Sequence, residues 1–204
     1  MKYKLDFSRR LDVSAPPVTG AVVAAPPLVF IAWQPSTWPA APSAVDEKFI
    51  YALKRIFEES ILGEIGNVIA DVQKSNGDLQ HRGHVIAISL MCALDAIASY
   101  GYRGHHVSDF IRVQFPSNYH PHADQIYELY RNSLVHSWNL FEASIYPDKT
   151  RIKLEGGSIA FGLLDFFEAL VQATESFLES LANDAVLQKN TLERYKELRE
   201  TARP

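Results

Sequence analysis

Several features that would place a protein in a special class are scarce or absent in this sequence. Its 204 residues include one cysteine, which excludes an internal disulfide and a disulfide-rich secreted scaffold. No stretch of about 18 uninterrupted apolar residues occurs, which argues against a transmembrane helix. The formal charge of -4 gives no general attraction to nucleic acid or to an anionic membrane, so a polyanion site would have to be local.

The composition that is present is typical of a soluble globular protein. Hydrophobic residues make up 47% of the chain and charged residues 22%, and the length favours one domain with an appendage over two small domains. The single cysteine, Cys92, lies in the apolar run 88–98 and is predicted to be a small buried side chain. Its isolation fits a reducing compartment, and we expect a cytoplasmic protein that binds no membrane and no cofactor.

Residues 1–44 form a Pro/Ala-rich extended arm that differs in amino-acid composition from the rest of the chain. The arm contains seven of the 11 prolines, and such a density excludes long helices and central strands. The apolar residues 28–33 and Trp38 make a purely solvated tail improbable. We therefore expect the arm to lie across the body or a partner, and residues 45–204 to form the domain.

Hydrophobic periodicity predicts most of that domain as helices. Apolar residues recur at three- and four-residue steps over 45–72, and the turn residues 75–78 end this helix. Residues 81–100 are apolar on nearly every face and predict a central helix surrounded by others. A short helix is expected over 108–115, and a fourth helix begins near Pro121, which suits a first helical turn.

The second half of the chain predicts a small β-hairpin and two more helices. Residues 141–145 and 150–154 alternate in character around the turn Pro147-Asp148-Lys149, as the strands of a hairpin do. Helices are then predicted over 159–181 and over the charged stretch 185–201. The predicted fold class is all-α: a bundle of about five to six helices with a small β-hairpin after the fourth.

The fourth predicted helix contains a short polar motif, Arg131-Asn132-Ser133-Leu134-Val135-His136. This segment resembles the R-N-x-x-x-H signature of the HEPN superfamily, small all-helical domains that include metal-independent endoribonucleases and inactive relatives. The resemblance covers about residues 46–184; the arm lies outside the family pattern, and the hairpin is at most a variation on it. It implies a homodimeric endoribonuclease of the toxin or defence type, acting on RNA and controlled by a cognate antitoxin or another partner protein.

The residue types of the motif suit RNA cleavage without a metal. Asn132 and His136 share a helix face, whereas Arg131 lies about 100° round the helix from Asn132. His136 can exchange a proton near neutral pH, and the guanidinium of Arg131 can bind phosphate oxygens. Asn132 can orient the imidazole or the phosphate. Because one histidine cannot easily act as both base and acid, a symmetric dimer would supply the second.

Further residues near the motif are candidates for substrate contact or for positioning. Aromatic residues can stack on unpaired bases, and arginines can form a basic rim for phosphates. A buried carboxylate on the central helix requires a cationic or hydrogen-bonding partner, and Arg131 is one option. The candidates are Tyr130, Trp138, Arg103 and Arg112 for RNA contact, and Asp95 and Glu128 for positioning Arg131.

Three other interpretations remain open. Arg131 and His136 can be structural, with Arg131 paired to Asp95 or Glu128 and His136 at the helix end. The chain can be a non-catalytic HEPN-like module that dimerises or binds a partner protein or a nucleotide. A metal site would require two of the three histidine pairs (His81 and His84, His105 and His106, His120 and His122) to converge, but no second cysteine and no HExxH accompany them. We therefore expect no metal.

Overall fold

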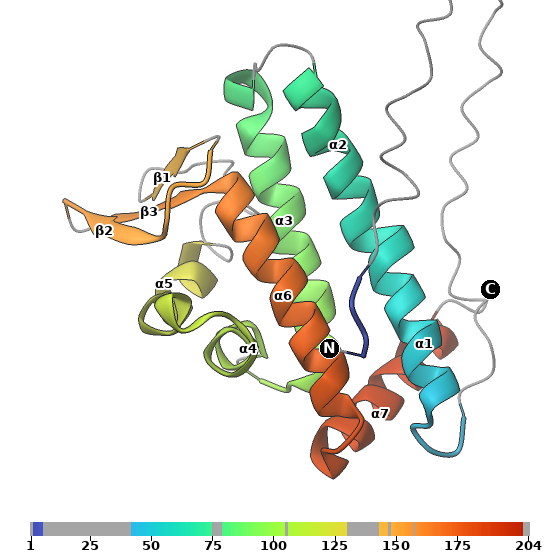
Figure 1. The fold of residues 1–204 in the computed structure, drawn as a ribbon. Helices are drawn as coiled ribbons and strands as arrows, with labels where there is room; N and C mark the ends of the chain where they lie inside the picture. Colours follow the sequence, from blue (N-terminus) through green and yellow to red (C-terminus); the bar gives the residue numbers. More distant parts are fainter. Residues whose placement is uncertain are drawn as a thin grey trace, which may run out of the picture.

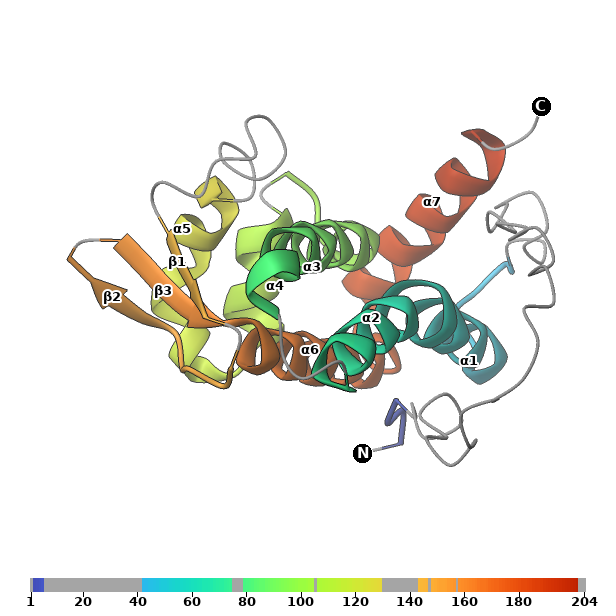
Figure 2. The ribbon, with the colours of Figure 1, turned by 90° about the horizontal axis from the view of Figure 1, so that it is seen from above.

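The structure is a computed structural model that describes residues 2–5, 42–74, 79–104, 106–129, 143–146, 148–156 and 158–201. This part of the chain is mostly helical, with a small three-stranded sheet after the fourth helix. The long helices α2, α3 and α6 lie along one another, and the sheet is at one end of the bundle (Figure 1). Seen from above, the sheet and α7 lie on opposite sides of α3 (Figure 2). The predicted fold class is thus confirmed in its helical part.

The first helix is continuous from residue 47 to residue 74 but changes its winding. Asp46 caps its start by accepting a hydrogen bond from the Phe49 amide at 2.8 Å. The helix consists of α1 (Glu47–Arg55), the π-helical segment η2 (Ile56–Leu62) and α2 (Gly63–Lys74). The fully buried Phe57 and Leu62 are five residues apart, a step that fits the wider π turn. The helix predicted over 45–72 is confirmed, and the π segment is a finding of the structure.

Helix α3 (Leu79–Gly101) is the central element, as its apolar composition predicts. It contacts α2, α4, α6 and α7, and Leu90, Leu94 and Ile97 have no solvent exposure. Within the described residues, Gly83–Gly101 is also long and apolar enough to cross a membrane. Half of that window is buried inside the fold, and the core helix of a soluble protein passes the same test of length and composition.

Two short helices follow on one side of α3 and lead toward the motif. Helix α4 (His106–Gln114) confirms the helix predicted over 108–115. The next predicted helix begins as the 3₁₀ helix η3 (Ser117–His122), which contains Pro121, and continues as α5 (Ala123–Glu128). Ala123, Ile126 and Leu129 are buried, so one side of α5 faces the core. The predicted continuation to residue 135 lies outside the described residues.

The sheet consists of β1 (Ala143–Tyr146), β2 (Lys153–Glu155) and β3 (Ser158–Gly162), in the order β1-β3-β2. Strand β1 pairs with β3 in parallel, and β2 pairs with β3 antiparallel. The predicted hairpin between 141–145 and 150–154 is therefore wrong, because β3 lies between the two segments. The turn that closes the antiparallel pair contains Gly156, whose φ of 58° favours glycine.

The segment between β1 and β2 is fixed to the start of α6. The Asp148 carboxylate accepts the Thr150 amide at 2.8 Å, a local turn contact within the described part of the predicted turn, whose first residue, Pro147, lies outside the described residues. The amides of Gly162 and Leu164 donate to the carbonyls of Thr150 (2.7 Å) and Asp148 (3.1 Å). A Cβ at Gly162 would be 2.3 Å from the Asp148 carbonyl oxygen, so only glycine fits this junction.

Helices α6 (Leu163–Leu181) and α7 (Ala185–Thr201) complete the bundle. The predicted start of α6 at residue 159 is wrong, since residues 158–162 form β3 and are largely buried as a strand. The prediction for α7 is confirmed, and Asp184 accepts hydrogen bonds from the Val186 and Leu187 amides at its start. The core between the helices is rich in aromatic rings that meet edge to face, among them Phe110 and Phe177.

The first residues of the chain are part of this core. Residues 2–5, here called the N-terminal strap, lie between α6 and α1 (blue in Figure 1). Tyr3 and Leu5 are only 2% and 5% exposed. The start of the arm therefore lies across the body. Residues 6–41, which include the apolar stretch 28–33 and Trp38, lie outside the described residues.

Candidate functional site

The R-N-x-x-x-H motif lies outside the described residues. Residues 130–142 include Arg131, Asn132, His136 and two candidates for base stacking, Tyr130 and Trp138, so all five assignments remain predictions. The described chain nevertheless leads directly to the motif. Leu129, one residue past α5, has αR backbone angles, and its amide donates to the carbonyls of Gln125 and Ile126. The backbone is therefore still helical two residues before Arg131.

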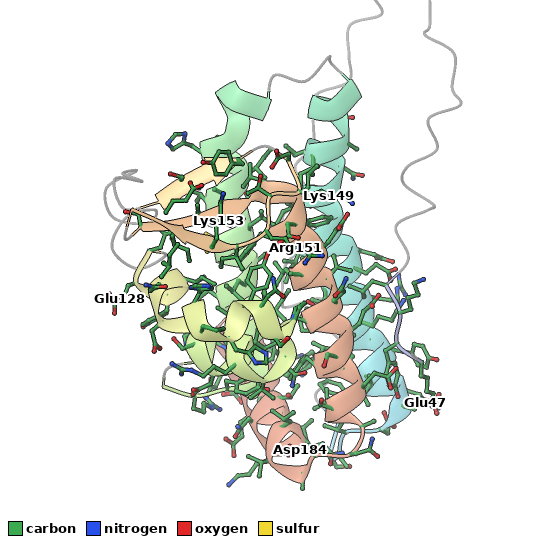
Figure 3. All side chains as sticks on the ribbon, turned by 60° about the vertical axis from the view of Figure 1, so that its left-hand side comes forward. Glu47, Glu128, Lys149, Arg151, Lys153 and Asp184 are labelled. Carbon is green, nitrogen blue, oxygen red and sulfur yellow. The ribbon has the colours of Figure 1, made fainter. Side chains whose placement is uncertain are left out.

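The side of α5 that faces away from the core borders a cavity of about 470 Å³. This cavity lies between α5 and the β2–β3 turn, and we call it the α5 cavity. Its polar side chains include Glu128, which extends from α5 on the surface (Figure 3). The other wall is the turn around Gly156. The lining residues are Asp124, Gln125, Glu128, Leu129, Gly156, Ser158 and Ile159.

The two arginines predicted to contact RNA are both paired with carboxylates. Arg103 is within 3.3 Å of Glu193 and 3.4 Å of Glu197, both on α7. Arg112 on α4 contacts Asp124 on α5, and its guanidinium is 3.6 Å from Asp109. The two arginines therefore pair with different helices, Arg103 with α7 and Arg112 with α4 and α5. These ion pairs are exposed and hold the arginines weakly, but they cancel much of the charge expected for a basic rim.

Three basic side chains form a row that lies just before β2 and at its first residue. Lys149, Arg151 and Lys153 are exposed at alternate positions, whereas Ile152 between them is buried (Figure 3). Lys149 pairs with Glu168, and Lys153 pairs with Glu155 at 2.5 Å. Arg151 forms no ion pair within the described part of the chain. The alternation K-x-R-x-K in the sequence was a signal for these three residues, which we call the basic row.

Asp95 pairs with a histidine, and not with an arginine, among the described residues. Its carboxylate is 2.7 Å from Nε2 of His106, at the start of α4, and its side chain is 34% exposed. The other ring nitrogen, Nδ1, is 3.2 Å from the carbonyl oxygen of Gly104. Both neighbours are acceptors, so the imidazolium, which donates from both nitrogens, is the form that satisfies them. This arrangement fastens α4 to α3.

The hydrogen bond to Asp95 raises the pKa of His106 above its ordinary value. Partial burial lowers it, and the negative charge of Asp95 and the bond to Gly104 raise it further. Arg194 on α7 opposes this shift from the other side, while its own Nε bonds to Ser99 at 3.3 Å. A histidine with both nitrogens occupied is poorly placed as a general base, so we assign the pair to architecture.

The prediction that Cys92 is buried is wrong. Its thiol is exposed on α3, one turn before Asp95, and partial desolvation together with the Asp95 charge raises the thiol pKa. A protonated thiol is a weaker nucleophile than a thiolate, so this shift does not activate Cys92. Cys92 lies in an apolar depression of about 390 Å³ between the first helix and α3, where the exposed Val68 and Val85 also contribute.

The histidines do not assemble into a metal site within the described residues. His106 bonds to Asp95, His120 is 2.8 Å from the Phe115 carbonyl, and His122 is 3.1 Å from the Gln125 side chain. No three potential metal ligands come together in the part of the chain that the structure describes. His84 is exposed on α3, and the side chains of His81 and His105 lie outside that part.

Sequence reasoning missed two polar contacts that organise the fold. The Tyr119 hydroxyl donates to Asp165 on α6 at 2.6 Å, and the carboxylates of Glu175 and Glu179 accept amides of the N-terminal strap. The available signal for the strap was the pair of large apolar side chains Tyr3 and Leu5 among the charged residues at the start of the chain.

No protein-family model, no curated protein and no solved structure matches the chain.

Proposed function

We propose that this protein is a metal-independent endoribonuclease of the HEPN type, with Arg131, Asn132 and His136 as its catalytic residues. The observation that carries the proposal is the R-N-x-x-x-H motif immediately after α5, in a mostly helical domain. The helical backbone angles at Leu129 support a motif that continues the α5 helix. In such a helix, Glu128, Asn132 and His136 share one face, because they are four residues apart.

The proposed reaction begins with attack of a ribose 2′-oxygen on the neighbouring phosphorus. The P–O5′ bond breaks, which leaves a 2′,3′-cyclic phosphate on one product and a 5′-hydroxyl on the other. One His136 takes the proton of the 2′-hydroxyl, and a second His136 gives a proton to the departing O5′. Arg131 stabilises the charge on the phosphate oxygens, and Asn132 orients the imidazole or the phosphate.

This division of labour requires two copies of the chain. In an isologous dimer, the same helix of each subunit meets its counterpart, so both copies of Arg131 and His136 share one cleft. The proposal therefore includes a homodimer in which the motif lies at the interface. Arg151 of the basic row, which forms no ion pair within the described residues, supplies a cation for phosphate contact outside this cleft, whereas Lys149 and Lys153 are paired with glutamates.

The second candidate function is a non-catalytic module that keeps the fold and binds a partner protein or a nucleotide. Charge is the observation that favours it. The chain is acidic overall, and the two arginines predicted to contact RNA are neutralised by glutamates and aspartates. Avid RNA binding draws most of its affinity from unpaired cations, so this distribution suits a protein-binding role.

The deciding experiment is RNA cleavage in excess chelator, with structured and single-stranded RNAs as substrates. We expect the wild type to leave 2′,3′-cyclic phosphate ends, and His136→Ala to lower the rate by about 10²- to 10⁴-fold. Substrates with 2′-deoxyribose at the cleaved position should be inert. His84→Ala, which removes an exposed histidine of α3, is the matched control and should cleave like the wild type.

Two outcomes would contradict the enzymatic proposal. Equal cleavage by the wild type and His136→Ala would mean that another group, or a contaminant, does the chemistry. Cleavage by neither protein, with both folded, would leave the non-catalytic module as the better account.

A further inference from the structure

Strand β2 is an open edge of the sheet. The strand order is β1-β3-β2, and within the described residues the backbone of β2 pairs with β3 alone. It is also the outermost strand, on the side away from α3 and α6 (Figure 2). An edge strand presents unpaired N–H and C=O groups, and another extended chain can pair with them.

The hairpin register makes Leu154 the residue of β2 whose backbone faces outward. Glu155 and Ser158 flank a two-residue turn, so these two residues exchange backbone hydrogen bonds. Bonded and non-bonded pairs alternate along an antiparallel ladder, so the pair at Lys153 is bonded and the pair at Leu154 is not. The N–H and C=O of Leu154 therefore point away from β3, toward the place of a neighbouring strand.

A second copy of the chain matches this backbone geometry. When two β2 strands meet antiparallel with Leu154 opposite Leu154 of the partner subunit, each N–H donates to the C=O of the other. This pairing places a two-fold axis at Leu154, as an isologous contact requires. The two three-stranded sheets then form one six-stranded sheet.

The side chains next to Leu154 are complementary in this arrangement. Lys153 falls opposite the partner's Glu155, and by symmetry Glu155 falls opposite the partner's Lys153. In the single chain Lys153 and Glu155 pair with each other, so they lie on the same side of the sheet. Opposite charges in directly facing positions stabilise a strand pair, whereas like charges destabilise it. The edge is therefore complementary in charge to itself.

Two further observations favour burial of this edge in a dimer. The Leu154 side chain is 52% exposed, and in the paired strands it would contact the partner's Leu154. The Tyr146 hydroxyl of β1 donates to the Glu155 carboxylate at 2.9 Å and holds it in place. The edge thus offers a second strand an apolar contact at its centre and a fixed anion beside it.

The same pairing brings the α5 cavities of two copies to one side of the joined sheet. Leu154 is the register partner of Ile159, which lines the α5 cavity, and register partners point to the same side of a sheet. A two-fold axis perpendicular to the sheet keeps that side in common for both copies. Gly156 also lines the cavity and is two residues from the axis. Helix α5, which leads to the motif, therefore lies on the same side of the joined sheet in both subunits.

We propose that the β2 edge is a homodimer interface in which two copies pair their β2 strands antiparallel, with Leu154 on the axis and Lys153 opposite Glu155. The role of this dimer rests on the proposed function, which requires two copies of the motif. A contact of three residues per strand is smaller than the roughly 800 Å² per subunit of a standard interface, so the dimer should dissociate on dilution.

The test is sedimentation equilibrium of the full-length chain and of charge variants over a wide range of protein concentration. We expect a reversible monomer–dimer equilibrium for the wild type. Lys153→Glu and Glu155→Lys each place like charges opposite each other, so each should weaken dimerisation about tenfold or more. The double variant restores opposite charges and should dimerise about tenfold more tightly than either single variant. Lys189→Glu reverses an exposed charge on α7 and should leave dimerisation unchanged.

A cross-linking test uses no charge change, in case the charge variants do not fold. In a Cys92→Ala background, Leu154→Cys places the two introduced thiols on the axis, where the Cα atoms of a bonded pair are about 5.5 Å apart. A disulfide spans that distance, so oxidation should yield a covalent dimer. Ser144→Cys, at an exposed position of β1 in the same background, should stay monomeric under the same oxidation.

Three outcomes would overturn the inference: a wild type that is monomeric at every concentration, a double variant no tighter than the single variants, or equal cross-linking at the two cysteine positions. After the first outcome, the edge would be open to a strand of another protein or to RNA. Failure of the enzymatic proposal differs from these results. A dimer that cleaves no RNA would keep the interface, whereas a monomer that cleaves RNA would refute the interface alone.

Discussion

Two polar regions of the molecule both contain paired side chains but differ in whether those side chains border a cavity. Where α3 ends beside α4 and α7, Asp95 is paired with His106, Ser99 with Arg194, and the Gly101 carbonyl with Asn190 at 2.8 Å. At the corner between α5 and the sheet, Asp124, Gln125 and Glu128 line a cavity of about 470 Å³. Both regions contain candidate residues that were predicted from the sequence. The environment of each region indicates a different role for its residues.

This difference distinguishes the polar residues that hold the fold together from those that are accessible to a ligand. A polar group whose donors and acceptors are all used by neighbouring helices contributes to architecture, as the His106 and Asp95 pair does. Polar side chains that border a cavity, next to a segment with a proton-transfer motif, are accessible to a ligand. The following predictions, in order of decreasing effect, test whether this distinction is real.

The largest effect is expected from Gly162→Ala, at the junction that holds the sheet against α6. The new Cβ would be 2.3 Å from the Asp148 carbonyl oxygen and 2.6 Å from the Thr150 amide nitrogen, and both are backbone atoms. We expect the free energy of unfolding to fall by about 3 kcal/mol or more. Urea denaturation followed by circular dichroism measures it.

Gly83→Ala is the control for this prediction. Its Cβ would meet Leu163 at 3.8 Å, an ordinary contact, in the second turn of α3. Alanine is the better helix former by about 0.5–1 kcal/mol, so this variant should be as stable as the wild type or more stable. Equal losses in the two variants would show that the close backbone contacts at Gly162 do not determine the stability of this junction.

A medium and pH-dependent effect is expected from His106→Gln. The folded state raises the pKa of His106, so its interactions stabilise the fold fully below the unfolded pKa of about 6.5. That contribution to stability is lost as the pH rises through the pKa that His106 has in the folded state. We expect the variant to be less stable by about 1 kcal/mol near pH 6 and the gap to shrink toward about pH 9. Urea unfolding of both proteins across this range gives the difference, and a gap independent of pH would refute the charged pair.

The smallest effect is expected from Arg103→Ala. Its two ion pairs with Glu193 and Glu197 are exposed and longer than 3.2 Å. Such surface pairs typically contribute under 1 kcal/mol, so the free energy of unfolding should change by at most about 0.5 kcal/mol. A loss of several kcal/mol in urea denaturation would mean that the exposed pairs of this region carry as much of the fold as the half-buried His106 pair.

The sequence was sufficient for the helices and insufficient for the strand pairing. Apolar steps of three and four residues located the first helix, because burial of one face imposes that period, and an apolar composition on nearly every face located α3. In contrast, Ile159 and Phe161 fit a strand as well as a helix, and the prediction chose the helix. The order β1-β3-β2 depends on contacts between Thr150 and Gly162, which are distant in sequence, so local patterns could not reveal it.

The candidate site was predictable only in its residue types. The composition of α3 predicted that Cys92 would be buried, yet an apolar helix shows no preferred face from which exposure could be read. Asp95 was expected to need a partner, but its choice of His106 depends on how the loop at Gly104 turns the chain. The motif itself stays a sequence prediction, since the structure describes the chain only as far as Leu129 before it.

The π-helical segment η2 gives the first helix two independent orientations. Each residue turns an α-helix by about 100°, and the extra residue in this wide turn shifts the phase between its halves. The upstream half, α1, thereby contacts α6 and the N-terminal strap, while the downstream half, α2, contacts α3. A helix of uniform α-helical winding could not orient both halves toward these neighbours at once. Removing one residue from η2 would rotate α2 away from the central helix while α1 kept its place.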